Sequence, residues 1–159
     1  MVIRKTLATF AVAAMLATLI AFTGTQSNVN AGGAGPDLEG SWEITITPQG
    51  AGPIVDIATF TSGGGMMNTD PDPNLSTGHG TWVKNGDHEY AVTFVHFLSN
   101  GGAALGTVKV RAVIQLDQQT DTFNGPFRTD VVIGGNVVQS FCGTVQATRI
   151  NVEALEACP

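Results

Sequence analysis

Aromatic rings and hydrogen-bonding side chains recur at every second position between residues 88 and 96. The residues of this set are His88, Tyr90, Val92, Phe94 and His96. In an extended strand all of them point to one face. Aromatic walls with a few polar groups are typical of a cavity for an apolar ligand. A filled core whose polar tips lie at the rim of a sheet has the same pattern, so parity alone leaves both interpretations open.

Two more aromatic residues, Trp82 and Phe127, are candidates for the same cavity. Trp82 precedes Asn85-Gly86, a dipeptide typical of hairpin turns. A three-residue loop with a bulge places Trp82 on the face of Tyr90, whereas a two-residue turn places His79 there instead. The expected ligand-binding residues are Trp82, Tyr90, Phe94, His96 and Phe127.

Asp56 and His96 are the candidates for acid–base catalysis. Asp56 shares its parity with Ile54, Ala58 and Phe60, so it is the strand carboxylate that we expect to point inward. Burial would raise its pKa and make it a general acid or base. The alternative is a position at the end of a strand, in water.

The three histidines do not have the close spacing of zinc motifs. His88 and His96 lie eight residues apart, which is about 26 Å along a strand, so they cannot share one metal. A two-histidine site with His79 remains open. The segment 70–74 begins like a calcium loop but lacks the glycine and the glutamate that complete one. We therefore expect no metal ion and no cofactor.

The N-terminus has the pattern of a secretory signal peptide. Arg4 and Lys5 precede an uncharged apolar run over 7–22, which is short for a membrane span. We expect a secreted or periplasmic protein with no stable membrane anchor after cleavage. Losing both cations changes the formal net charge from -6 to -8, which argues against nucleic acid and anionic membranes as partners. The expected segments are a signal peptide and cleavage region at 1–31, a flexible lead-in at 32–37, a barrel at 38–150 and a tail at 151–159.

Cys142 and Cys158 are the two cysteines of the chain. In an oxidising compartment a disulfide is the default state of such a pair. Cys142 has the outward parity of its strand, so a bridge would hold the C-terminal tail against the outside of the sheet. We expect this Cys142–Cys158 disulfide in the exported protein.

Strand-like runs separated by turn clusters occupy the rest of the chain, and no segment has a helical period. The runs cover residues 41–47, 54–61, 66–69, 79–84, 88–98, 105–116, 122–133 and 137–150. Short connections between them favour antiparallel neighbours, and closure removes the exposed edges of such a meander. The sequence predicts an all-β fold, a single eight-stranded antiparallel up-and-down β-barrel.

Trp42 and Arg149 have the inward parity of the first and last runs. A buried arginine needs a partner, and an indole ring with nearby carbonyls provides one. Gly-x-Trp in the first strand with an arginine in the last resembles the structural signature of the calycins, the lipocalins and their relatives. That resemblance implies that Trp42 and Arg149 pack together at the closed end of a barrel.

The resemblance implies an exported binding protein that holds a small apolar molecule in the barrel mouth. The barrels of allene oxide cyclases and dirigent proteins are similar at this level, so a cyclase or isomerase acting on an apolar substrate is the alternative. A ligand-free surface module is the third hypothesis. A filled interior would favour the ligand-free surface module. An apolar cavity without inward ionisable groups would favour the binding protein. A cavity with Asp56 or His96 beside Tyr90 would favour the enzyme. The sequence does not indicate the oligomeric state.

Overall fold

The structure is a computed structural model that describes residues 37–158 of the chain. The predicted signal peptide and nearly all of the lead-in lie outside these residues. Eight strands make up the described part: β1 (Gly40–Pro48), β2 (Ile54–Phe60), β3 (Gly65–Thr69), β4 (Gly78–Lys84), β5 (Glu89–Asn100), β6 (Ala103–Asp117), β7 (Thr122–Ile133) and β8 (Asn136–Arg149). Within residues 37–158 no helix is long and apolar enough to span a membrane.

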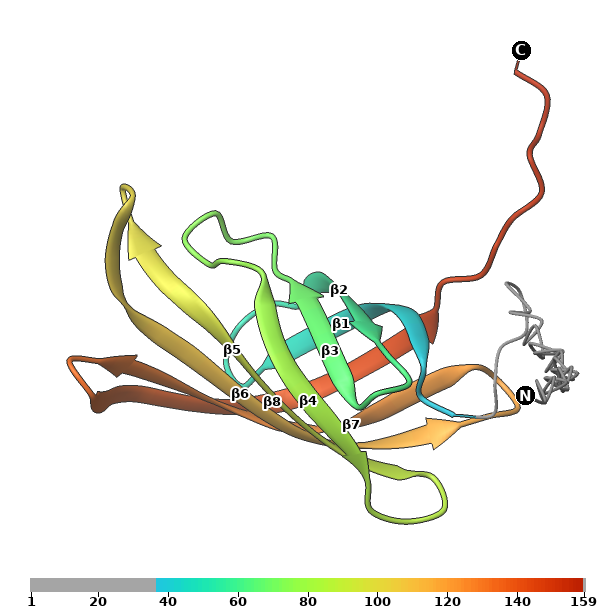
Figure 1. Ribbon diagram of the computed structural model, residues 1–159, viewed down its shortest axis with the longest axis horizontal. Coiled ribbons are helices and arrows are strands. Elements are labelled where there is room, and N and C mark those ends of the chain that lie inside the picture. The colour runs from blue at the N-terminus through green and yellow to red at the C-terminus, as the bar shows by residue number, and fades with distance from the viewer. Residues whose placement is uncertain (1–36, 159) are drawn as a thin grey trace, which may run out of the picture. The chain divides into compact units, whose positions relative to one another are not determined.

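The strands form the closed antiparallel barrel that the alternating pattern predicts (Figure 1). Each strand pairs with the next along the chain, and β1 closes the barrel on β8 with Trp42 opposite Arg149. Every strand begins and ends within two residues of its predicted bounds. The hydrophobic alternation fixes this register, because a shift by one residue would turn each apolar side chain into water.

The four strands from β5 to β8 are longer than β2, β3 and β4. Their two hairpins therefore extend past the short strands at one end of the barrel (Figure 1). The register shifts within these extensions, at Leu98/Ser99 and at Val131/Val132. Such shifts bend a strand pair and are frequent at barrel rims.

Aromatic packing closes the opposite end of the barrel. Trp42 is fully buried, donates its indole N–H to the Leu38 carbonyl at 2.9 Å and lies 4.9 Å from the ring centre of Phe123. Tyr90 is also fully buried, and its hydroxyl donates to the Asp37 carboxylate at 2.8 Å. We call this closed end the plug; it consists of the aromatic residues Trp42, Trp82, Tyr90 and Phe123 with Asp37 and Leu38, which lie just before β1.

Arg149 joins this plug to the last strand. Its guanidinium carbon lies 4.2 Å from the centre of the Trp42 ring system, and its Nε donates to Asp121 at 3.0 Å. The two terminal nitrogens donate to the carbonyls of Glu39 and Asp37. A buried guanidinium with a carboxylate, two carbonyls and an aromatic face has its charge compensated.

Gly40 has a geometric role in this closure. Its φ of +120° is a backbone conformation that other residues rarely adopt, and a Cβ atom there would lie 2.7 Å from Arg149 Nη1. The glycine of the Gly-x-Trp motif is therefore required by both the backbone and the arginine.

The predicted Cys142–Cys158 disulfide is not present, because both cysteines are free thiols in the structure. Cys142 lies on β8 as expected, but residues 150–158 form no strand and are exposed. No backbone pairing holds Cys158 beside β8, so the tail is not fixed against the barrel in this state.

Candidate functional site

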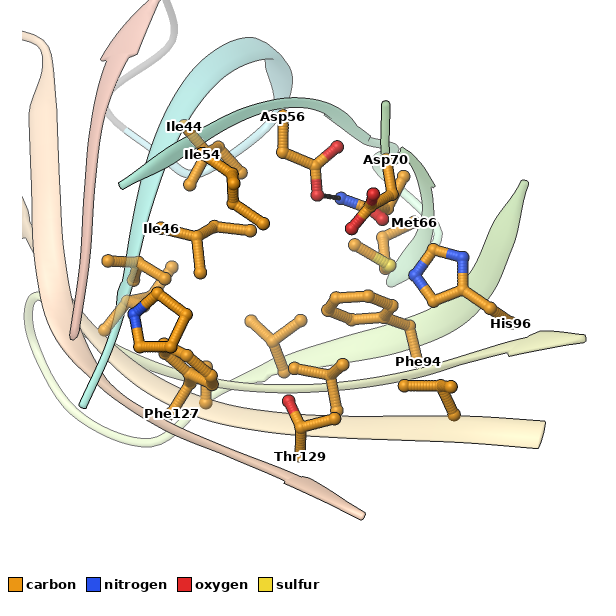
Figure 2. A pocket seen from close by; sticks show the side chains of 18 of the residues that line it. Ile44, Ile46, Ile54, Asp56, Met66, Asp70, Phe94, His96, Phe127 and Thr129 are labelled. Atoms are coloured by element: carbon orange, nitrogen blue, oxygen red, sulfur yellow. Dashed lines mark hydrogen bonds between the residues drawn. The ribbon is translucent and has the colours of Figure 1, made fainter. Parts of the chain in front are cut away.

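The barrel contains a partly open cavity of about 130 Å³ between the aromatic plug and the opposite end. Aliphatic and aromatic side chains make up nearly all of its wall (Figure 2). Pro48, Ile54, Asp70 and Leu75 border it where the β1–β2 and β3–β4 connections begin or end. The volume resembles that of an apolar protein cavity of about 150 Å³ that stays dry and binds benzene. The enclosed space suits one ring or a short alkyl chain.

Small residues keep this space open. Ala112 on β6 lines the cavity beside Val92 and Phe127, its partners on β5 and β7. Gly143 on β8 lies against the Phe127 ring, and a Cβ atom at Gly143 would come within 2.6 Å of that ring. A larger residue at Ala112 would reduce the cavity directly, whereas one at Gly143 would meet both the Phe127 ring and the Thr47 backbone carbonyl of β1.

The cavity wall formed by β2 and β3 carries a buried polar pair. Asp56 and Asn68 are 2% and 3% exposed, and Asn68 Nδ2 donates to Asp56 Oδ2 at 2.6 Å. The other Asp56 oxygen accepts the Ile57 backbone N–H at 2.8 Å. The Asn68 side-chain oxygen is buried without a hydrogen-bond partner, an arrangement that costs stability and is rare in native proteins.

Burial raises the pKa of the Asp56 carboxyl from 3.8 to about 6. The hydrogen bonds from Asn68 and Ile57 act in the opposite direction, and the nearby negative charge of Asp70 adds to the rise. None of the ion pairs within residues 37–158 involves Asp56. Around neutral pH the barrel therefore holds an ionised carboxylate that has no ion-pair partner within residues 37–158.

We expect Asp56→Asn to stabilise the barrel above about pH 6. The raised pKa means that the folded state prefers the protonated carboxyl, so wild-type stability falls as pH rises from about 4 to about 6 and then stays level. The shift corresponds to roughly 2–3 kcal/mol at most. Urea midpoints near pH 4 and pH 8 measure the difference. Glu43→Gln, on the exposed outer face of β1, is the control. A difference between Asp56→Asn and wild type that does not change with pH would contradict the assignment.

His96 connects the cavity to the β3–β4 connection. Its ring is 2% exposed and lines the cavity, and Nδ1 lies 2.6 Å from the Ser76 carbonyl. Since a carbonyl only accepts, Nδ1 carries the proton, and Nε2 of the neutral ring is an acceptor. Gly78 provides the space for this ring, because a Cβ atom there would lie 2.8 Å from it.

Residues 74–76 of the β3–β4 connection are held against β5. Leu75 pairs with Leu98, and Ser76 N donates to the Phe97 carbonyl at 3.0 Å. Asp70 and Asp72 accept the backbone N–H groups of Asp72 and Asn74. The segment that resembles the start of a calcium loop is thus a series of turns that sets Asp70 and Leu75 at the cavity border.

The structure separates the predicted ligand residues into two groups. Phe94, His96 and Phe127 line the cavity. Trp82 and Tyr90 do not, because they pack on each other in the plug with ring centres 5.7 Å apart. Trp82 does share the face of Tyr90, but the turn that places it there spans the four residues 85–88.

The remaining histidines lie away from the cavity. His88 is exposed in the turn before β5 and is not part of the strand face predicted for it, and His79 is exposed on β4. No group of three or more potential metal ligands occurs within residues 37–158.

Sequence reasoning missed Asn68 and Thr129, two polar residues that line the cavity. Asn68 shares its parity with Met66, which is also buried. Thr129 alternates with Phe127 on β7. That parity was the available signal in the sequence.

Comparisons of the chain with protein-family models, with curated proteins and with solved structures find no match.

Proposed function

We propose that this chain is an exported, lipocalin-like binding protein that holds a small apolar molecule inside its barrel. The observation that carries the proposal is the cavity of about 130 Å³ with its aliphatic and aromatic wall. Empty apolar space costs stability, so a packed barrel would be the simpler solution for a purely structural module. The basic and then apolar N-terminus supports export.

The size of the cavity limits the ligand. Pockets for drug-sized molecules usually measure about 300–1,000 Å³, well above the volume enclosed here. A ring or short chain fits inside, and a larger ligand would extend through the end bordered by Pro48 and Leu75. Long fatty acids and retinoids are therefore poor candidates for complete enclosure.

Native mass spectrometry of the protein purified from its own host tests this proposal. We expect a bound molecule of low mass, together with a rise in melting temperature when single-ring compounds are added to the empty protein. Ligand at about 100 times its dissociation constant adds about 2.7 kcal/mol of stability. A bare protein mass, with no melting shift from any ring compound or short alkane, would favour the ligand-free module.

A cyclase or isomerase is the second candidate, because Asp56 and His96 both line the cavity. Tyr90, the expected third member, lies in the plug with its hydroxyl on Asp37. An enzyme of this kind would use Asp56 as the general base, since its pKa of about 6 suits proton transfer near neutral pH. Asp56→Asn should then abolish conversion of the host-derived ligand while leaving it bound. Unchanged product formation in that variant would exclude this role.

A further inference from the structure

The polar atoms of the cavity are gathered mainly on one wall. Asp56 comes from β2, Asn68 from β3, and Asp70 directly follows β3. Figure 2 shows Asp56 and Asp70 on the same side of the cavity.

Acceptors outnumber donors among the polar atoms of this wall, where the second N–H of the Asn68 amide is the remaining donor. The Asn68 amide donates to Asp56, which leaves the buried Asn68 oxygen without a donor. If the Asn68 amide were reversed, its NH2 group would be the unpaired end. Its oxygen would then face the ionised carboxylate of Asp56. A buried acceptor without a donor costs about 1–3 kcal/mol.

No cation among the lining residues neutralises these acceptors. The cavity is lined by no lysine or arginine from residues 37–158. His96 gives its Nδ1 proton to Ser76 and offers Nε2 as a further acceptor in the neutral ring. The Thr129 hydroxyl can donate or accept. Among the lining residues, carboxylates and acceptors therefore outnumber donors, and none is a lysine or an arginine.

We propose that the wall formed by Asp56, Asn68 and Asp70 binds the protonated amino group of an otherwise apolar ligand about one ring in size. The inference rests on the proposed function and specifies its ligand. An ammonium group brings three donors, and its positive charge would compensate the two carboxylates that line this wall. A neutral hydroxyl brings one donor and no charge for the desolvated Asp56.

The same wall disfavours anionic ligands. A fatty acid or phosphate group placed there would meet two carboxylates and an unpaired carbonyl oxygen. Like charges in a desolvated site repel strongly. The wall should therefore bind an amine more tightly than a fatty acid, because the two ligands carry opposite charges.

Calorimetric titration with three compounds of the same skeleton tests the inference. The compounds are phenethylamine, phenethyl alcohol and ethylbenzene, measured at about pH 8, where an alkylamine is protonated and Asp56 ionised. We expect phenethylamine to bind about tenfold to a hundredfold more tightly than phenethyl alcohol, as a charge-assisted hydrogen bond allows. Equal or tighter binding of the alcohol or the hydrocarbon would overturn the amine assignment while leaving the proposed function intact. Binding of none of the three would count against both.

The Asp56→Asn variant tests whether Asp56 causes the preference for the amine. Glu43→Gln is the control, because it removes the same charge from the outer face of β1. We expect the preference for the amine to fall to about twofold or less in Asp56→Asn and to persist in Glu43→Gln. Urea titration of each variant shows whether it is folded. If folded Asp56→Asn keeps the full preference, the amino group binds elsewhere and the inference is wrong. If that variant does not fold, the wild-type comparison of amine with alcohol still decides.

Discussion

Arg149→Ala is expected to lower the free energy of unfolding of the barrel by about 3–4 kcal/mol. The change removes the cation over the Trp42 ring and three hydrogen bonds of the plug. It also leaves Asp121 and the carbonyls of Glu39 and Asp37 without this donor. Small domains have only about 5–15 kcal/mol of total stability, so the loss is large. Urea denaturation followed by tryptophan fluorescence measures it.

Lys84→Ala is the matched control for this experiment. Lys84 also pairs with Asp37 at the closed end of the barrel, at 3.1 Å, but its side chain is 45% exposed. Exposed ion pairs contribute about 1 kcal/mol or less. An Arg149→Ala midpoint as close to wild type as that of Lys84→Ala would show that the plug does not depend on the arginine.

Ala112→Phe is expected to weaken binding of single-ring ligands by about a hundredfold or more. The new ring extends from the β6 wall into the space between Val92 and Phe127, and so occupies the site of the ligand. Because that space is empty, the added ring should cost less than the roughly 1–3 kcal/mol usual for overpacking. Binding is measured by calorimetry and stability by urea titration.

Val113→Phe provides the control on the neighbouring position of β6. Val113 points to the opposite face and is 40% exposed, so the same ring there stays outside the barrel. Its ligand affinity should equal that of wild type. Equal affinities for Ala112→Phe and Val113→Phe would place the binding site outside the cavity.

The fold was largely predictable because each strand has one apolar face. Alternation gave the strands, and their short connections gave the antiparallel order. The inward parity of Trp42, Arg149 and Asp56 followed from the same alternation. These conclusions depend on local spacing, which a single sequence contains. The packing of Trp42 against Arg149 was implied by the resemblance to the calycins.

Position along the barrel axis was not predictable from parity. Trp82, Tyr90 and Phe94 share one face, yet the first two belong to the plug and only Phe94 lines the cavity. The stagger of all eight strands determines which inward side chains pack in the plug and which line the cavity. The partners of Asp37 and Asp121 come from distant segments and have no local signal. The Cys142–Cys158 disulfide stays a prediction for the exported protein, since both cysteines are free in the structure and no backbone pairing holds the C-terminal tail on β8.

Calorimetric titration of the wild-type barrel with ethylbenzene tests the central proposal most directly, because this ligand has no polar group. We expect one-to-one binding with a dissociation constant of about 10 µM to 1 mM. Burial of apolar surface should make the heat capacity change negative, and Ala112→Phe should remove the signal. Absence of binding heat from wild type at millimolar ligand, with the same trace from Ala112→Phe, would mean that the barrel does not hold an apolar molecule.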